Sequence, residues 1–255
     1  MSLSLRLRAG ASAALKHLAV SVLVALMVGA LVFGVWYPSP YDELAGGQDL
    51  FWLVIVVDVV CGPLLTLVIF NPKKPRNELA RDIGLVVLIQ LAALIYGLNS
   101  VAQARPVWLA FEGSRFRVVS VPDLADQNLG EAPESLRSLS WTGPKLLSVK
   151  LAQPTDQDYQ QSVLRSLEGL HPAFRPSRWQ SYESQVPDLL QVLQPVDRLL
   201  TKQPSKAGMV RAALKDWEPE ALGFLPLVSG DVSDWVVIVR RDTGQPISYL
   251  AVDGY

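Results

Sequence analysis

The chain has few residues from which a covalent or metal-bound site could be built. Its 255 residues include one cysteine, Cys61, and two histidines, His17 and His171, which lie far apart in sequence. One cysteine cannot form an intrachain disulfide, and it cannot supply a cysteine-based zinc site or a haem-attachment motif. The formal net charge is −1, so no basic surplus indicates a nucleic-acid-binding protein.

Sequence motifs of common enzyme classes are also missing. The chain has no H-E-x-x-H, G-x-S-x-G, P-loop or dinucleotide-binding pattern. Asp156, Asp158, Glu168 and His171 lie close in sequence, but His171 follows an expected helix end, where the helix dipole favours its cation over a role as metal ligand. We therefore predict no catalytic residues, no metal and no cofactor.

Long apolar runs are abundant in the first hundred residues. We expect membrane-spanning helices at about 18–36, 50–70 and 83–101, because about 20 apolar residues cross the hydrocarbon core of a bilayer. A cleaved signal peptide would also have a basic start and an apolar core. The first run is longer than a usual signal core, and Trp36-Tyr37-Pro38 is a poor cleavage site.

The charged loops assign each segment to a side of the membrane. Basic residues occur in the amino-terminal tail and in the loop between the second and third runs, whereas the loop between the first and second runs is only acidic. The positive-inside rule then places the N-terminus in the cytoplasm and everything after the third span outside. We expect a multi-pass protein of the bacterial inner membrane, with residues 1–103 in the membrane unit and residues 104–255 in the periplasm.

One carboxylate, Asp58, interrupts the second run. Such a group costs about 2.5–3.5 kcal/mol at mid-span and therefore usually faces protein or water. One interpretation is a contact with a partner helix or with the free amine of that partner. The other is a protonated carboxyl bonded within the bundle, to Gln90, Thr66 or Asn99. Pro63, one turn later, removes a backbone hydrogen bond and creates either a groove for another helix or a simple packing adjustment.

Small residues recur at four-residue spacing in the first run, as Ala25 with Gly29 and Ala30 with Gly34. Such pairs permit close packing of helices.

The remaining residues predict an α+β domain with a mainly antiparallel sheet. Two strands should form a hairpin around Glu112-Gly113-Ser114, another strand should lie near 145–151, and three should close the chain after residue 223. A helix capped by Thr155 should carry an apolar stripe of Tyr159, Val163, Leu167 and Leu170. Further helices are expected at 188–202, with a break at Pro195, and at 205–217. The latter should be capped by Ser205 and should bury Met209, Val210, Ala213, Leu214 and Trp217.

Residues 171–187 are rich in proline, arginine and aromatic side chains, which is typical of an extended surface loop. Arg175, Arg178, Trp179 and Tyr182 form either a contact surface for a partner or a strap whose aromatic residues lie on the core.

Several stretches resemble one family. They are WYPSPY after the first run, DVVCGPLLTLVIFNPKK in and after the second, ELARDIGLVVLIQLAALIYGL in the third, and VWLAFEGSRFRVV beyond it. This pattern resembles the TfpX/TfpZ family of type IV pilin accessory proteins. The resemblance implies a non-enzymatic inner-membrane chaperone or assembly factor for a cognate type IV pilin, affecting pilin stability and pilus biogenesis. It implies no catalytic residues.

Two other functions compete with this interpretation. A membrane-anchored periplasmic ligand-binding sensor or regulator would need a signalling output, and the expected cytoplasmic segments are too short for one. An anchored periplasmic hydrolase would need a nucleophile motif, which the chain lacks.

Overall fold

The computed structural model describes residues 3–255. The chain divides into two compact units, Met1–Arg105 and Pro106–Tyr255. The division lies two residues beyond the expected boundary, and each unit is described here by itself.

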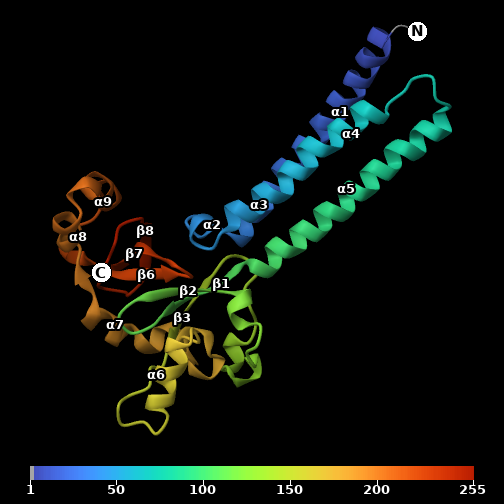
Figure 1. Cartoon of the computed structure of the whole chain (residues 1–255). Helices are drawn as coiled ribbons and strands as arrows, with labels where there is room; N and C mark the ends of the chain where they lie inside the picture. The colour runs from blue at the N-terminus through green and yellow to red at the C-terminus, as the bar shows by residue number, and fades with distance from the viewer. Residues whose placement is uncertain (1–2) are drawn as a thin grey trace. The chain divides into compact units, whose positions relative to one another are not determined.

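The first unit is helical (Figure 1). Among the described residues, three helical stretches are long and apolar enough to cross a membrane: Arg6–Trp36, Gly47–Ile69 and Arg76–Ala104. The three predicted runs lie inside these stretches, except for Phe70 at the end of the second run. The elements of the first unit are α1 (Leu3–Leu31), the π-helical turn η1 (Val32–Trp36), α2 (Tyr41–Leu44), α3 (Gly47–Val56), the π-helical turn η2 (Val57–Cys61), α4 (Gly62–Ile69) and α5 (Arg76–Ala104).

An apolar cluster holds one end of this unit together. Val32, Tyr37, Phe51, Ile55 and Val101 are buried in it. The Tyr37 hydroxyl donates a hydrogen bond of 2.9 Å to the carbonyl oxygen of Val101 and is fully buried, so its polar group is satisfied.

The predicted small-residue face is confirmed in part. A Cβ added to Gly29 would lie 3.2 Å from the Phe51 ring, so α1 and α3 approach closely there. Gly34 has no described neighbour within 4 Å of such an atom.

The second unit contains one mixed, mostly antiparallel sheet (Figure 1). Within residues 106–255, its path is β4-β3-β1-β2-β6-β7-β8, and β5 pairs with β6 off this path. The β1–β3 and β2–β6 pairs are parallel, and the other pairs are antiparallel. The strands are β1 (Pro106–Phe111), β2 (Phe116–Ser120), β3 (Lys145–Val149), β4 (Trp179–Gln180), β5 (Gln194–Pro195), β6 (Leu222–Ser229), β7 (Val232–Arg240) and β8 (Pro246–Leu250).

The predicted hairpin, the following strand and the three final strands are confirmed. Gly113 has a φ of 74° and Gly244 a φ of 71°, which suits glycine at the turn after β1 and at the turn before β8. Every residue of β1 and β6 is buried, which identifies them as central strands.

Short helices surround the sheet. Three turns of 3₁₀-helix, η3 (Val121–Leu124), η4 (Leu129–Glu131) and η5 (Glu134–Leu136), cover β1 and β3 with the segment 171–181. The helices α8 (Asp197–Lys202) and α9 (Ala207–Leu214) cover β6, β7 and β8. The remaining α-helices of this unit are α6 (Tyr159–Leu167) and α7 (Val186–Val192).

Four details of the helix predictions are wrong. The N-cap residues are Asp158 for α6 and Lys206 for α9, so neither Thr155 nor Ser205 caps its helix. Both helices begin later in the chain than predicted. Turns occupy 154–158 before α6, and the 3₁₀-helix η9 (Pro204–Lys206) precedes α9. Met209 and Trp217 are exposed rather than buried, and Trp217 instead lies 5.3 Å from the Arg240 guanidinium.

Candidate functional site

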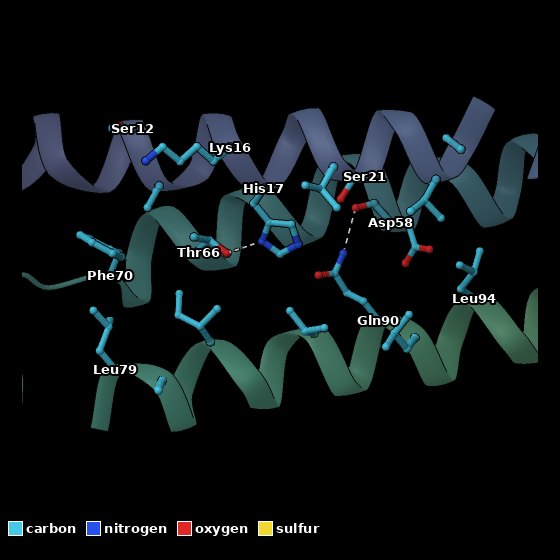
Figure 2. Close-up of a pocket in the computed structure, with 18 of the residues that line it drawn as sticks. Ser12, Lys16, His17, Ser21, Asp58, Thr66, Phe70, Leu79, Gln90 and Leu94 are labelled. Carbon is cyan, nitrogen blue, oxygen red and sulfur yellow. Dashed lines mark hydrogen bonds between the residues drawn. The ribbon is translucent and has the colours of Figure 1, made fainter. Parts of the chain in front are cut away.

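A hollow opens along the helical unit between α1, α4 and α5 (Figure 2). Its volume is about 710 Å³, and most of its lining is apolar. Polar side chains interrupt this lining at Arg76 and at seven residues labelled in Figure 2: Ser12, Lys16, His17, Ser21, Asp58, Thr66 and Gln90. A groove of this composition fits a largely apolar ligand that also carries polar groups.

Asp58 belongs to the π-helical turn η2 and lines the hollow. Its side chain is 8% exposed, and its Oδ1 atom has no hydrogen-bond partner among the described residues. An unmet buried carboxylate oxygen costs more than a paired one, so this atom is the strongest candidate for contact with a ligand.

The structure explains why Gln90 does not bond to this carboxyl. Its Nε2 atom donates 3.0 Å to the backbone carbonyl oxygen of Asp58 instead. In a π-helix, each carbonyl oxygen accepts a hydrogen bond from the N–H five residues later. The residue five positions after Asp58 is Pro63, which has no N–H, so the Asp58 carbonyl needs a donor from outside the turn. Gln90, one of three partners that the bundle interpretation allowed, is therefore not bonded to the Asp58 carboxyl.

Thr66 is not a partner of Asp58 either. Its hydroxyl lies 2.6 Å from Nδ1 of His17, across the contact between α1 and α4. His17 lines the same hollow and was not predicted as a site residue. It lies four residues before Ser21, so both face one side of α1, and that spacing is the signal in the sequence that could have found it.

Pro63 is buried beside η2 and does not line the hollow. Its role is local, since it follows the π-helical turn that brings Asp58 to the groove.

The four residues predicted in the strap 171–187 lie in the second unit. Trp179 is 2% exposed, donates from Nε1 to the carbonyl oxygen of Ala173 at 2.8 Å, and contacts Trp108 edge-on. Tyr182 is also 2% exposed and donates to the carbonyl oxygen of Gly244 at 2.5 Å, and its burial raises the pKa of its hydroxyl. Both are core residues, as the strap interpretation predicts, and neither offers a surface to a partner.

The two arginines of the strap are held by α6. Arg178 pairs with Asp158, and Nη2 of Arg175 donates to the Ser162 hydroxyl at 2.9 Å. Arg175 is 5% exposed, and burial lowers the pKa of its guanidinium. These arginines fasten α6 to the strap.

His171 differs from the sequence prediction. Burial and the nearby charge of Arg117 lower the pKa of its imidazole, so its neutral form is favoured rather than the cation. It follows Gly169 and Leu170 rather than the helix end itself, and its ring contacts Phe174 edge-on. Among the described residues, no group of three histidine, cysteine, aspartate or glutamate side chains is placed to hold a metal ion.

Comparisons with known proteins agree on one family. A family model described as "Fimbrial assembly protein FimB" matches residues 5–46. Two curated proteins of Dichelobacter nodosus, the fimbrial assembly proteins of serogroup E1 and serogroup I, are each 34% identical over 229 residues, which cover 89% of this chain and 89% of each relative. The fimbrial assembly protein of serogroups C1 and C2 is 41% identical over 116 residues, which cover 46% of this chain and 88% of the relative. No solved structure matches the chain. Because the similarity to the first two relatives runs through both units, the chain belongs to the fimbrial assembly protein family.

Proposed function

We propose that the protein is a non-enzymatic accessory factor of the TfpX/TfpZ kind that acts as a chaperone for a type IV pilin in the bacterial inner membrane. In this proposal the three apolar helices span the bilayer, the N-terminus is cytoplasmic and residues 106–255 are periplasmic. The relatives are named for fimbrial assembly, which supports the process.

The observation that carries the proposal is the apolar groove with Asp58 in it. A type IV pilin waits for assembly with one hydrophobic helix in the inner membrane and a soluble head outside. The groove between α1, α4 and α5 offers such a helix an apolar packing surface. This surface would stabilise the pilin helix while the pilin has no neighbouring subunits.

In this proposal Asp58 fixes the position of the bound pilin helix along the groove. The mature pilin helix begins with a free amine, and the unmet Oδ1 atom of Asp58 is a strong acceptor for that group. The pilin helix also carries a carboxylate near its amino end, which would repel Asp58 unless one of the two is protonated. The groove also holds the imidazole of His17 and the cations Lys16 and Arg76, so the amine of the pilin would need to approach Asp58 rather than the basic side chains.

Replacement of Asp58 tests this function. Asp58→Asn keeps the size of the side chain and removes its charge, and we expect capture of the cognate pilin from detergent-solubilised membranes to fall about tenfold. The control is Asp49→Asn, in the first turn of α3, which does not line the groove. The measurement is the ratio of co-purified pilin to tagged protein. Unchanged capture by a normally expressed Asp58→Asn protein would remove Asp58 from the site, and absence of pilin from the wild-type eluate would refute the function.

A further inference from the structure

A second hollow lies in the soluble unit, between α6 and the turn that joins β1 to β2. Its volume is about 400 Å³. One wall is apolar and the other is charged, and neither belongs to the membrane groove.

The apolar wall is formed by three of the four residues of the predicted stripe, since Leu170 lies beyond the end of α6 and does not line the hollow. Tyr159, Val163 and Leu167 follow one another at four-residue spacing and all line the hollow. Val163 is 43% exposed and Leu167 is 80% exposed, so this stripe packs into no core within its unit. The buried residue of α6 is Ser162, which accepts the hydrogen bond from Arg175. The helix is thus fastened by polar contacts, and its apolar side chains are left for another surface.

The charged wall is basic, because its one carboxylate, Glu112, is already paired with Arg117. The Oε2 atom of Glu112 accepts from Nε of Arg117 at 3.1 Å, and its Oε1 atom accepts from the backbone N–H of Ala173 at 3.2 Å. Both carboxylate oxygens are therefore occupied. Arg115 lines the same hollow, and its guanidinium lies 5.8 Å from the centre of the Tyr255 ring. Among the described residues no carboxylate forms an ion pair with Arg115, so its charge is available to an anion.

The shape of the hollow favours a protein segment over a lipid surface. Arg117 and Glu112 are 4% and 7% exposed and lie in the lining of a concavity. A flat bilayer cannot follow a concavity, whereas one or two side chains of an extended peptide can enter it. The exposed stripe and the charge of Arg115, which no carboxylate neutralises among the described residues, favour a ligand that is apolar and carries a negative group.

We propose that this hollow binds a peptide segment of a partner protein in which a carboxylate lies beside apolar side chains. The carboxylate pairs with Arg115, and the apolar side chains cover Val163 and Leu167. The choice of the pilin head as the protein to test rests on the proposed function.

Site-specific photocrosslinking tests this inference in living cells. The photoreactive residue p-benzoylphenylalanine replaces Leu167 in the full-length protein, expressed with its cognate pilin. The matched control places it at Leu164, which is 59% exposed on the same helix but does not line the hollow. We expect a crosslink to the pilin head from position 167 and little from position 164, with mass spectrometry locating it beside an aspartate or glutamate.

A charge change separates docking from mere proximity. In the Leu167-substituted protein, Arg115→Glu should lower crosslinking about fivefold, whereas Arg115→Lys should retain most of it. Crosslinks to lipid alone, equal crosslinking from both positions, or indifference to the charge at position 115 would overturn the inference. Loss of the position-167 crosslink while pilin capture still depends on Asp58 would refute this site and leave the proposed function standing.

Discussion

Glycine residues lie at the closest contacts between the helices of the first unit. A Cβ added to Gly97 would lie 2.5 Å from Val54, and one added to Gly62 would lie 2.0 Å from Nε2 of Gln90. The absence of a side chain at Gly62 therefore makes room for the amide that bonds to the Asp58 carbonyl. The glycine at position 62 thus allows Gln90 to donate its hydrogen bond to the carbonyl oxygen of Asp58 in η2.

Gly62→Ala should destabilise the helical unit because the added methyl group displaces Gln90. Gln90 can swing aside, but the Asp58 carbonyl then loses its donor, and we expect a loss of about 1–3 kcal/mol, which is typical of a buried polar group left unsatisfied. The control is Gly84→Ala in α5, where the new atom meets no described atom within 4 Å and should gain helix propensity. Thermal unfolding of both purified proteins in detergent measures the difference. Equal melting temperatures would show that Gln90 moves without cost.

Sequence reasoning found Asp58 but not its surroundings. A charge in an apolar run is visible without a structure, since its insertion cost marks it. The neighbours of Asp58 depend on how three helices rotate about their axes, and only contacts such as that of Gly62 with Gln90 fix this rotation. For the same reason, the pairing of His17 with Thr66 was not predicted.

The strap 171–187 and the β1–β2 hairpin are joined by one buried carboxylate. Glu112 bonds to Arg117 of β2 and to the backbone of Ala173 in the strap. Both charged side chains are almost fully buried, so removal of either would leave the other without compensation. The position of the strap therefore depends on a residue at the hairpin turn.

Glu112→Ala should lower the free energy of unfolding by about 3–5 kcal/mol, because it leaves Arg117 buried and unpaired. The control is Asp242→Ala, which removes the exposed carboxylate that pairs with Arg240 and should change stability far less. Urea unfolding of the full-length protein in detergent, followed by tryptophan fluorescence, compares the two. Similar midpoints would show that the strap is held mainly by Trp179 and Tyr182.

The elements of the second unit were predicted with different success for physical reasons. Strand positions follow from apolar runs between turn residues, so the hairpin and the three final strands were found. The parallel pairing of β1 with β3 joins segments far apart in sequence, and no local pattern encodes it. The stripe of α6 was recognised correctly as apolar, but periodicity cannot distinguish a face that packs on a core from one that waits for a partner.

The whole molecule combines helices of membrane-spanning length with a second unit built on a mixed sheet. The basic loop between α4 and α5 and the basic start of α1 predict that both lie in the cytoplasm. The prediction of an outward-facing second unit rests on these charges, since length and composition do not reveal orientation.

Reporter fusions test this orientation. Alkaline phosphatase fused after Tyr255 should be active, because it folds in the periplasm, and green fluorescent protein at the same position should be dark. A fluorescent fusion placed in the 70–75 loop should instead be bright. A bright fusion after Tyr255 would place the second unit in the cytoplasm and remove the geometry on which the proposed function depends.

The two ends of the sheet determine whether a neighbouring chain can extend it. An exposed edge strand invites a neighbouring chain to add to it. Here one edge is β4, which is only two residues long, and the other is β8, which begins at Pro246 and is followed by carbonyls at Ala251 and Tyr255 that accept from Lys206 and Lys202. Such edges make a poor template for strand addition, so we expect the second unit to resist pairing of this kind with a neighbouring chain even when that chain is abundant.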